Sequence, residues 1–274
     1  MKSLLPAVLA IATVAVCLPA APVAAGGTVD RLYVFNCGEG HAPDQSRWSP
    51  GVNVGQPIDL SDNCYLIRHG QDYLLWDTGI GDAVADRPDG APGQNGAPTW
   101  QVPKTLASQL AAIDVKPADI HFVAISHTHP DHIGNVELFP QSTLLVQKAE
   151  YEWPLPSGGS RFKPEHPVKK LEGDYDVFAD GSVLLISTPG HTPGHQSLLV
   201  KLPKTGAVLL SGDAVHFKDN WENRRVPALN VDREKTLASM QRIADLLAQN
   251  GAQLWINHDR VQSLQQKHAP EFYD

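Results

Sequence analysis

The stretch His127-Thr128-His129-Pro130-Asp131-His132 places three imidazoles and a carboxylate within six residues. Imidazole and carboxylate groups are the side chains that bind zinc and similar metal ions in proteins. The stretch follows directly on the apolar run of residues 120–125, which predicts a buried strand. A solvated histidine-rich loop would not explain that placement, so we interpret the stretch as a metal site. His127 and His129 are expected to bind one ion, and Asp131 and His132 a second ion beside it.

Three more potential ligands stand just after predicted strands elsewhere in the chain. His191 follows a strand over residues 183–187, Asp213 follows one over 207–210, and His258 follows one over 254–256. In layered α/β folds the loops at strand ends carry the chemistry. We therefore expect these side chains to converge on the histidine stretch. Gly134 is expected to permit a tight backbone turn just beyond that stretch.

Runs of β-forming residues alternate with helix-forming runs, which predicts an α/β fold. Further strands are expected over residues 31–36, 64–68, 73–76, 143–147 and 197–202, the last forming a hairpin with 207–210. Helices are expected over residues 104–113, 133–138 and 234–249. Residues 80–103 and 153–170 form long proline-containing loops, and loops of this length are usually functional or mobile. We expect them to determine specificity.

The composition is that of an ordinary globular protein, with 274 residues, 42% hydrophobic and 19% charged. A single domain over residues 26–274 is expected, as a monomer or a homodimer. The net charge is −8 and the chain has no basic run, which argues against a nucleic-acid partner. A small-molecule substrate is the expected partner.

The N-terminus has the pattern of a cleavable signal peptide over residues 1–25. Lys2 precedes an apolar run over residues 4–18, and the small residues Val23 and Ala25 favour cleavage before Gly26. A membrane anchor is the alternative, but the apolar run is short for a membrane span. No later segment is long and apolar enough to cross a bilayer. The mature protein is therefore expected to be periplasmic or secreted.

Cleavage would remove Cys17 and leave Cys37 and Cys64. A lipoprotein would use Cys17, but Val16 stands before it where a small residue is expected. In an oxidising compartment Cys37 and Cys64 could pair, since both lie at the ends of predicted strands. Two buried free thiols are the alternative, and the residues leave both open.

The histidine stretch resembles the HxHxDH motif of the metallo-β-lactamase superfamily. Thr188-Pro189-Gly190-His191, Gly212-Asp213 and His258 resemble the later motifs of that family, in the same order. The resemblance implies an αββα sandwich of two packed mixed β-sheets flanked by helices. It also implies two zinc ions, or other divalent metals, at one edge of the sheets.

The same resemblance implies a role for each motif residue. The first metal would be bound by His127, His129 and His191, the second by Asp131, His132 and His258, with Asp213 between them. Asp77 would orient a histidine ligand through a hydrogen bond. His195 would be structural and not a ligand.

Enzymes with this arrangement are hydrolases in which a hydroxide held between the two metals attacks a carbonyl carbon. Asp131 would pass a proton to the leaving group. A carboxylate at Asp213 disfavours a true β-lactamase. Several stretches resemble the N-acyl homoserine lactonase branch, namely residues 62–68, 74–79, 189–197, 224–227 and 232–237. The resemblance thus implies that the chain opens the ring of N-acyl homoserine lactones, a quorum-quenching activity.

His216 departs from the pattern of that branch, whose members often carry a tyrosine three residues after the aspartate between the metals. Either His216 donates a similar hydrogen bond to the substrate carbonyl, as a catalytic residue, or it marks a different substrate. The alternatives are another ester, thioester or organophosphate metallohydrolase on the same scaffold, and less favoured a β-lactamase or a metal-binding protein without turnover.

Five aromatic side chains lie in or near predicted loops. They are expected either to line an apolar groove for an acyl chain or to cap the ends of the sheets. They are Trp48, Trp100, Trp153, Phe162 and Trp221.

Overall fold

The first half of the chain forms a large sheet. The structure is a computed structural model that describes residues 28–155 and 159–274, so the predicted signal peptide lies outside the described residues. The sheet contains β1 (Val29–Ala42), β2 (Ile58–His69), β3 (Asp72–Trp76), β4 (Thr99–Gln101), β5 (Phe122–Ala124), β6 (Thr143–Gln147) and β7 (Val168–Leu171). The strand order is β4-β1-β2-β3-β5-β6-β7. Neighbours from β4 to β3 pair antiparallel, and from β3 to β7 they pair parallel.

A second, smaller sheet follows in the sequence. It contains β8 (Tyr175–Asp176), β9 (Val183–Ser187), β10 (Gln196–Leu202), β11 (Gly206–Leu210) and β12 (Gln253–Trp255). The order is β12-β11-β10-β9-β8, and only the β11–β12 pair is parallel. The two sheets are therefore both mixed.

In the described part of the chain, six α-helices connect or cover the sheets. They are α1 (Leu106–Ala111), α2 (Pro130–Ile133), α3 (Lys148–Tyr151), α4 (Lys218–Asn223), α5 (Arg233–Asn250) and α6 (Arg260–Ser263). The longest, α5, begins where the Asp232 carboxylate accepts a hydrogen bond from Lys235 N and ends at Gly251, which is left-handed with φ 58°. The described residues also form the short 3-10 helices η1 (Gln45–Arg47), η2 (Asp82–Val84), η3 (Pro117–Asp119), η4 (Val136–Leu138) and η5 (Gly212–Ala214).

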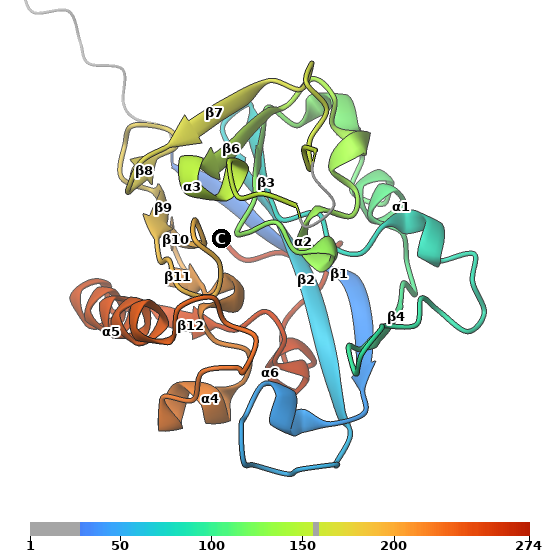
Figure 1. Ribbon diagram of the computed structural model, residues 1–274. Coiled ribbons are helices and arrows are strands. Elements are labelled where there is room, and N and C mark those ends of the chain that lie inside the picture. Colours follow the sequence, from blue (N-terminus) through green and yellow to red (C-terminus); the bar gives the residue numbers. More distant parts are fainter. Residues whose placement is uncertain (1–27, 156–158) are drawn as a thin grey trace, which may run out of the picture.

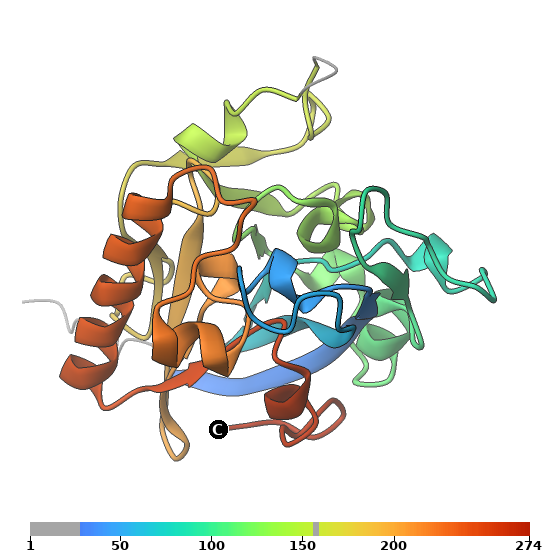
Figure 2. The same cartoon turned by 60° about the horizontal axis from the view of Figure 1, so that its bottom comes forward.

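The two sheets pack face to face around one apolar core. That core takes side chains such as Leu32, Ile67 and Trp76 from the large sheet and Leu198 and Val208 from the small one. Alternate residues of the same strands point outward, where one layer packs under α1 and another under α5. The two helices lie on opposite sides of the sandwich (Figure 1, Figure 2). The predicted αββα sandwich is confirmed.

The two cysteines whose pairing the sequence left undecided form a disulfide. Cys37 on β1 is bonded to Cys64 on β2, and both are buried. Cys37 stands at a shift in the β1–β2 register, and beyond it the ladder continues to Ala42. The strand predicted over residues 31–36 is thus longer than expected.

The segment after the histidine stretch also differs from the prediction of one helix over residues 133–138. Helix α2 begins earlier, at Pro130, and the 3-10 turn η4 follows separately. Gly134 does not make a turn that only glycine allows, because its φ is −60°. It is needed for close approach instead, since a Cβ there would lie 2.3 Å from Gly81 N.

Within the described part of the chain, no helix has both the length and the apolar character to cross a membrane.

Candidate metal centre

Seven side chains meet at the edge of the sandwich where several strands end. His127 and His129 lie in the loop after β5, and α2 carries Asp131 and His132 in its first turn. Proline is favoured at the first position of a helix, which explains why α2 begins at Pro130. His191 follows β9, Asp213 lies in η5 after β11, and His258 follows β12. The structure therefore brings together all seven residues that the sequence analysis selected as metal ligands.

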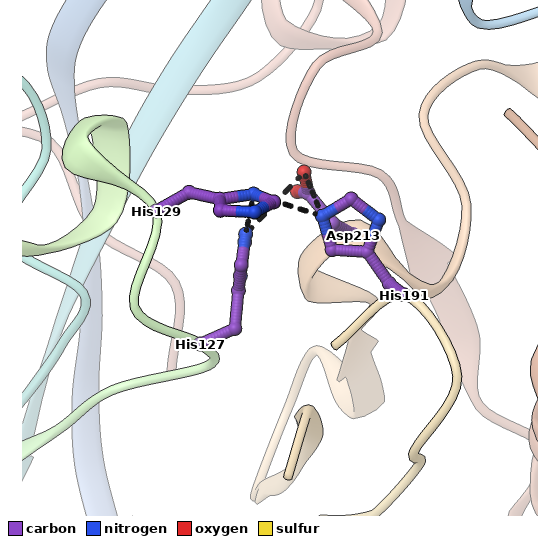
Figure 3. Close-up of side chains that lie close together, drawn as sticks. All are labelled: His127, His129, His191 and Asp213. Carbon is purple, nitrogen blue, oxygen red and sulfur yellow. Dashed lines mark hydrogen bonds and ion pairs between the residues drawn. The ribbon is translucent and has the colours of Figure 1, made fainter. Parts of the chain in front are cut away.

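The first group is formed by His127, His129, His191 and Asp213, whose ligand atoms all lie within 4.8 Å of one another. His129 Nδ1 is 2.9 Å from His127 Nε2 and 3.1 Å from His191 Nε2. Asp213 Oδ2 lies 3.4 Å from His191 Nε2. Figure 3 shows the three rings and the carboxylate converging from separate loops.

The second group is formed by Asp131, His132 and His258. Asp213 Oδ1 lies 3.3 Å from His132 Nε2 and 3.1 Å from His258 Nε2. The two oxygens of Asp213 therefore face different groups, Oδ2 toward the first and Oδ1 toward the second. A carboxylate between two such groups is the arrangement expected of a shared ligand.

The donor set fits metal ions. His132 Nε2 and Asp213 Oδ1 are buried and have no hydrogen-bond partner among the residues that the structure describes, which is costly unless another group satisfies them. Burial lowers the pKa of His127 and of His191 well below 6.5, so both rings are neutral at pH 7. A neutral imidazole is the form that binds a metal ion. The first group could therefore bind a cation directly. In the second group Asp213 raises the pKa of His132 well above 6.5 and that of His258 to about 9, so a cation bound there would replace a proton on these rings.

Hydrogen bonds at Nδ1 fix the orientation of two histidine rings of the second group. His132 Nδ1 lies 2.9 Å from Asp77 Oδ2, and Asp77 Oδ1 accepts a bond from Ser126 N. His258 Nδ1 donates to Ser61 O at 2.7 Å. Each such bond holds the other ring nitrogen toward the centre. Sequence reasoning had pointed to Asp77 but missed Ser61, which contributes a backbone oxygen that no motif reveals.

His195 is held in a different way. Its Nε2 accepts a hydrogen bond from Asp213 N at 2.8 Å, and its Nδ1 lies 3.0 Å from Thr188 O. Burial lowers the pKa of His195 to about 4. The neutral ring supports the backbone of Asp213 and both of its nitrogens are engaged.

His216 lies beside the carboxylate that faces both groups. Its Nε2 is 3.0 Å from Asp213 Oδ2, and its ring packs between His191 and His258. Within residues 28–155 and 159–274, His216 Nδ1 is buried without a hydrogen-bond partner. The ring also borders the cavity described next, so the structure places His216 between the candidate metal ligands and the space for a substrate.

A cavity of about 660 Å³ opens directly over the site. Its floor includes Asp131, His216 and His258, and its walls are mostly apolar. The predicted specificity loop over residues 80–103 lines it, whereas none of the described residues of 153–170 does. The first loop is also not wholly irregular, because it contains η2 and β4.

The five aromatic side chains expected in or near loops differ in whether they line the cavity or pack against the sheets. Trp48 and Trp100 line the cavity. Trp153 lies outside it, with its ring 6.1 Å from that of His129. Phe162 and Trp221 pack into apolar clusters, so the cavity interpretation is wrong for them. Phe162 lies in a loop, whereas Trp221 lies on helix α4 and not in a loop as expected.

Residues 58–248 match the family model described as the metallo-beta-lactamase superfamily. The chain belongs to this superfamily. It is a hydrolase, as are its curated relatives, which are N-acyl homoserine lactonases.

Curated relatives match over most of the chain. The N-acyl homoserine lactonase AttM of Azorhizobium caulinodans is 33% identical over 236 residues, covering 80% of this chain and 90% of the relative. The N-acyl homoserine lactonase of a Bacillus species is 32% identical, covering 89% of this chain and 99% of the relative.

Solved structures agree with this likeness. A crystal structure of a quorum-quenching N-acyl homoserine lactone lactonase superimposes with a TM-score of 0.78 at 30% identity, covering 89% of this chain and 98% of that one. Another, with N-hexanoyl-L-homoserine bound at its catalytic metal centre, has a TM-score of 0.78 at 29% identity, covering 89% and 99%.

Proposed function

We propose that this hydrolase opens the lactone ring of N-acyl homoserine lactones, using two zinc ions bound at the candidate metal centre. One observation carries the proposal: the carboxylate Asp213 faces two ligand groups, and a largely apolar cavity opens over both. The polar lactone ring of such a substrate would lie beside the ligands, and its apolar acyl chain would lie along the apolar walls of the cavity. The names of the relatives support the same substrate class.

The first ion would be held by His127, His129 and His191, and the second by Asp131, His132 and His258, with Asp213 shared. Bound there, the ions would supply an activated water and polarise the substrate carbonyl. Other divalent metals with the same ligand preferences would also fit.

Two side chains have proposed roles in the reaction itself. Asp131 is partly exposed and lies on the cavity floor, so its carboxylate can accept the proton that the attacking water loses and pass it to the alkoxide that leaves when the ring opens. His216 borders the same space and can donate a hydrogen bond to the substrate carbonyl. Opening one ester bond then consumes one water and yields the N-acyl homoserine.

We further propose that the mature enzyme works outside the cytoplasm. The N-terminal pattern of residues 1–25 supports this, and so does the buried Cys37–Cys64 disulfide, because disulfides persist mainly in oxidising compartments.

The test is a substrate panel on protein reconstituted with zinc. It contains N-acyl homoserine lactones of several chain lengths, a cephalosporin reporter, a glutathione thioester and an aryl phosphotriester. Lactones are expected to give the highest kcat/KM, and Asp213→Ala is expected to remove that activity. A higher kcat/KM for the thioester or the phosphotriester would contradict the lactonase proposal and would make the chain a thioesterase or an organophosphate hydrolase of the same superfamily. Fewer than two zinc ions per chain would refute the two-metal centre.

A further inference from the structure

Glu150 is a buried carboxylate that the proposed reaction does not use. It lies on the short helix α3, labelled in Figure 1 beside β6. Its side chain has no exposed surface. Among the ion pairs of residues 28–155 and 159–274, none involves Glu150. A buried charge without a cation is costly unless hydrogen bonds satisfy it, so its contacts explain why it is there.

Those contacts join two loops of the candidate metal centre. Glu150 Oε1 accepts hydrogen bonds from Thr128 N at 2.8 Å and from Thr128 Oγ1 at 2.7 Å. Glu150 Oε2 accepts one from Gly194 N at 3.0 Å. Thr128 stands between His127 and His129, and Gly194 lies three residues after His191.

The close approach to the second loop is built into the sequence. A Cβ at Gly194 would lie 2.3 Å from Glu150 N, so only glycine lets the loop reach the carboxylate. One oxygen thus serves the loop of His127 and His129, and the other serves the loop of His191.

We propose that Glu150 is a positioning residue that sets the geometry of the first ligand group by holding these two loops together. The rings of the second group are oriented by other partners, namely Asp77 for His132 and Ser61 O for His258. The inference rests on the two-metal centre of the proposed function. It predicts that the two ions depend differently on Glu150.

Glu150→Gln is the sharpest variant. A carboxylate has two acceptor oxygens, whereas an amide has one acceptor and one donor group. Glutamine has the same size but leaves the backbone N–H of either Thr128 or Gly194 without an acceptor. Glu150→Asp keeps the charge but is one methylene too short to reach both loops, and it provides a second variant should glutamine not fold.

The experiment measures the affinity of both ions by competition with a chelator and records the visible spectrum of the cobalt-loaded protein. The spectra of His191→Ala and His258→Ala assign absorption bands to the first and second ion. Glu150→Gln is expected to weaken the first ion about 10- to 100-fold and to alter its band, as loss of a ligand-orienting partner does. The second ion is expected to change by less than about threefold.

Asp82→Asn is the matched control. The Asp82 carboxylate also accepts two backbone N–H bonds, from Leu106 and Ala107, but these belong to α1. It is expected to lower stability without changing either cobalt band. Equal weakening of both ions in Glu150→Gln, or no weakening, would overturn the proposal. If the wild-type chain binds only one ion, the two-metal centre fails, and the effect of Glu150→Gln on that ion still decides the role of Glu150.

Discussion

His216 is the residue at which this sequence departs from the pattern of the lactonase branch. It lies 3.0 Å from Asp213 Oδ2, forms a further potential metal-binding group with Asp213 and His258, and borders the cavity. A donor placed at a developing oxyanion is worth more than its ground-state hydrogen bond, because the charge grows in the transition state.

If His216 donates to the substrate carbonyl, His216→Phe will lower kcat for lactone hydrolysis by about 10²-fold, the usual cost of losing one such donor. His216→Tyr restores a hydroxyl donor and is expected to recover most of that loss. Steady-state kinetics with parallel zinc analysis checks this. Loss of zinc in His216→Phe, with no recovery by tyrosine, would instead make His216 a metal ligand.

His195 makes stability depend on pH. Its folded-state pKa of about 4 lies below the ordinary value of 6.5, so the fold holds the neutral ring. Its contribution is complete above pH 6.5 and is lost as the pH falls toward 4, because the unfolded chain takes up the proton first. The loss amounts to about 3 kcal/mol.

In His195→Gln this part of the acid dependence is expected to disappear, since an amide does not titrate. Urea unfolding of both metal-depleted proteins at pH 7, 5.5 and 4.5 measures it. The wild-type free energy of unfolding should fall more steeply with acid than that of the variant. Parallel curves would show that His195 is not held neutral.

At the scale of elements, the strands of about five continuous apolar residues were the most predictable part, whereas the longer strands β1 and β2 were predicted only in part. The strands over residues 143–147 and 183–187 have the predicted bounds, because each is a continuous β-forming run. The short strands β4, β7 and β8 were missed, since two to four residues carry little periodicity and their pairing depends on distant partners. The strand β7 begins inside the segment 153–170 that was predicted to be a loop. The start of α2 was also missed, although Pro130 is a signal for a first helical position.

The strand β4 places Trp100 on the wall of the cavity. Trp100 lies between Gly40 and the centre, with its ring 6.0 Å from that of His258. Trp100→Ala is expected to raise KM for long-chain lactones about tenfold and to leave short-chain lactones nearly unchanged, because an apolar wall contributes in proportion to the area that it covers. Kinetics across chain lengths checks this.

Trp221→Ala is the control, since Trp221 packs against α5 and the small sheet and not against the cavity. It should lower stability without a chain-length effect. An equal rise in KM for every chain length in Trp100→Ala would place the acyl chain elsewhere.

For the whole molecule, the motifs were enough to predict the sandwich and to gather the seven candidate ligands. The supports around them were not predictable in the same way. Ser61 acts through a backbone oxygen, and Glu150 acts from 22 residues beyond Thr128. The Ser61–His258 and Glu150–Gly194 contacts join the two sheets, and the Thr128–Glu150 contact joins the ends of the neighbouring strands β5 and β6. All of them depend on how the strands are arranged in space, which no local pattern encodes.

The export proposal predicts a defined mature chain. Expressed with residues 1–25 in a Gram-negative host, the protein is expected in the periplasmic fraction with Gly26 as its first residue. N-terminal sequencing of the purified protein checks this. An intact Met1 on a cytoplasmic protein would contradict it, whereas an intact N-terminus in the membrane fraction would indicate an uncleaved anchor.

The Cys37–Cys64 disulfide, which an oxidising compartment would preserve, is expected to stabilise the fold. It closes a loop between residues 27 apart, which in the chain-entropy model stabilises the fold by about 3.5 kcal/mol by restricting the unfolded chain. The β1–β2 ladder does not depend on it, so the fold should survive its removal. Cys37→Ala/Cys64→Ala is therefore expected to unfold at lower urea concentration, with zinc content unchanged. Adding reductant should destabilise the wild type and leave the double variant unaffected. Equal stability of the two proteins under oxidising conditions would show that the unfolded chain is not restricted by this bond.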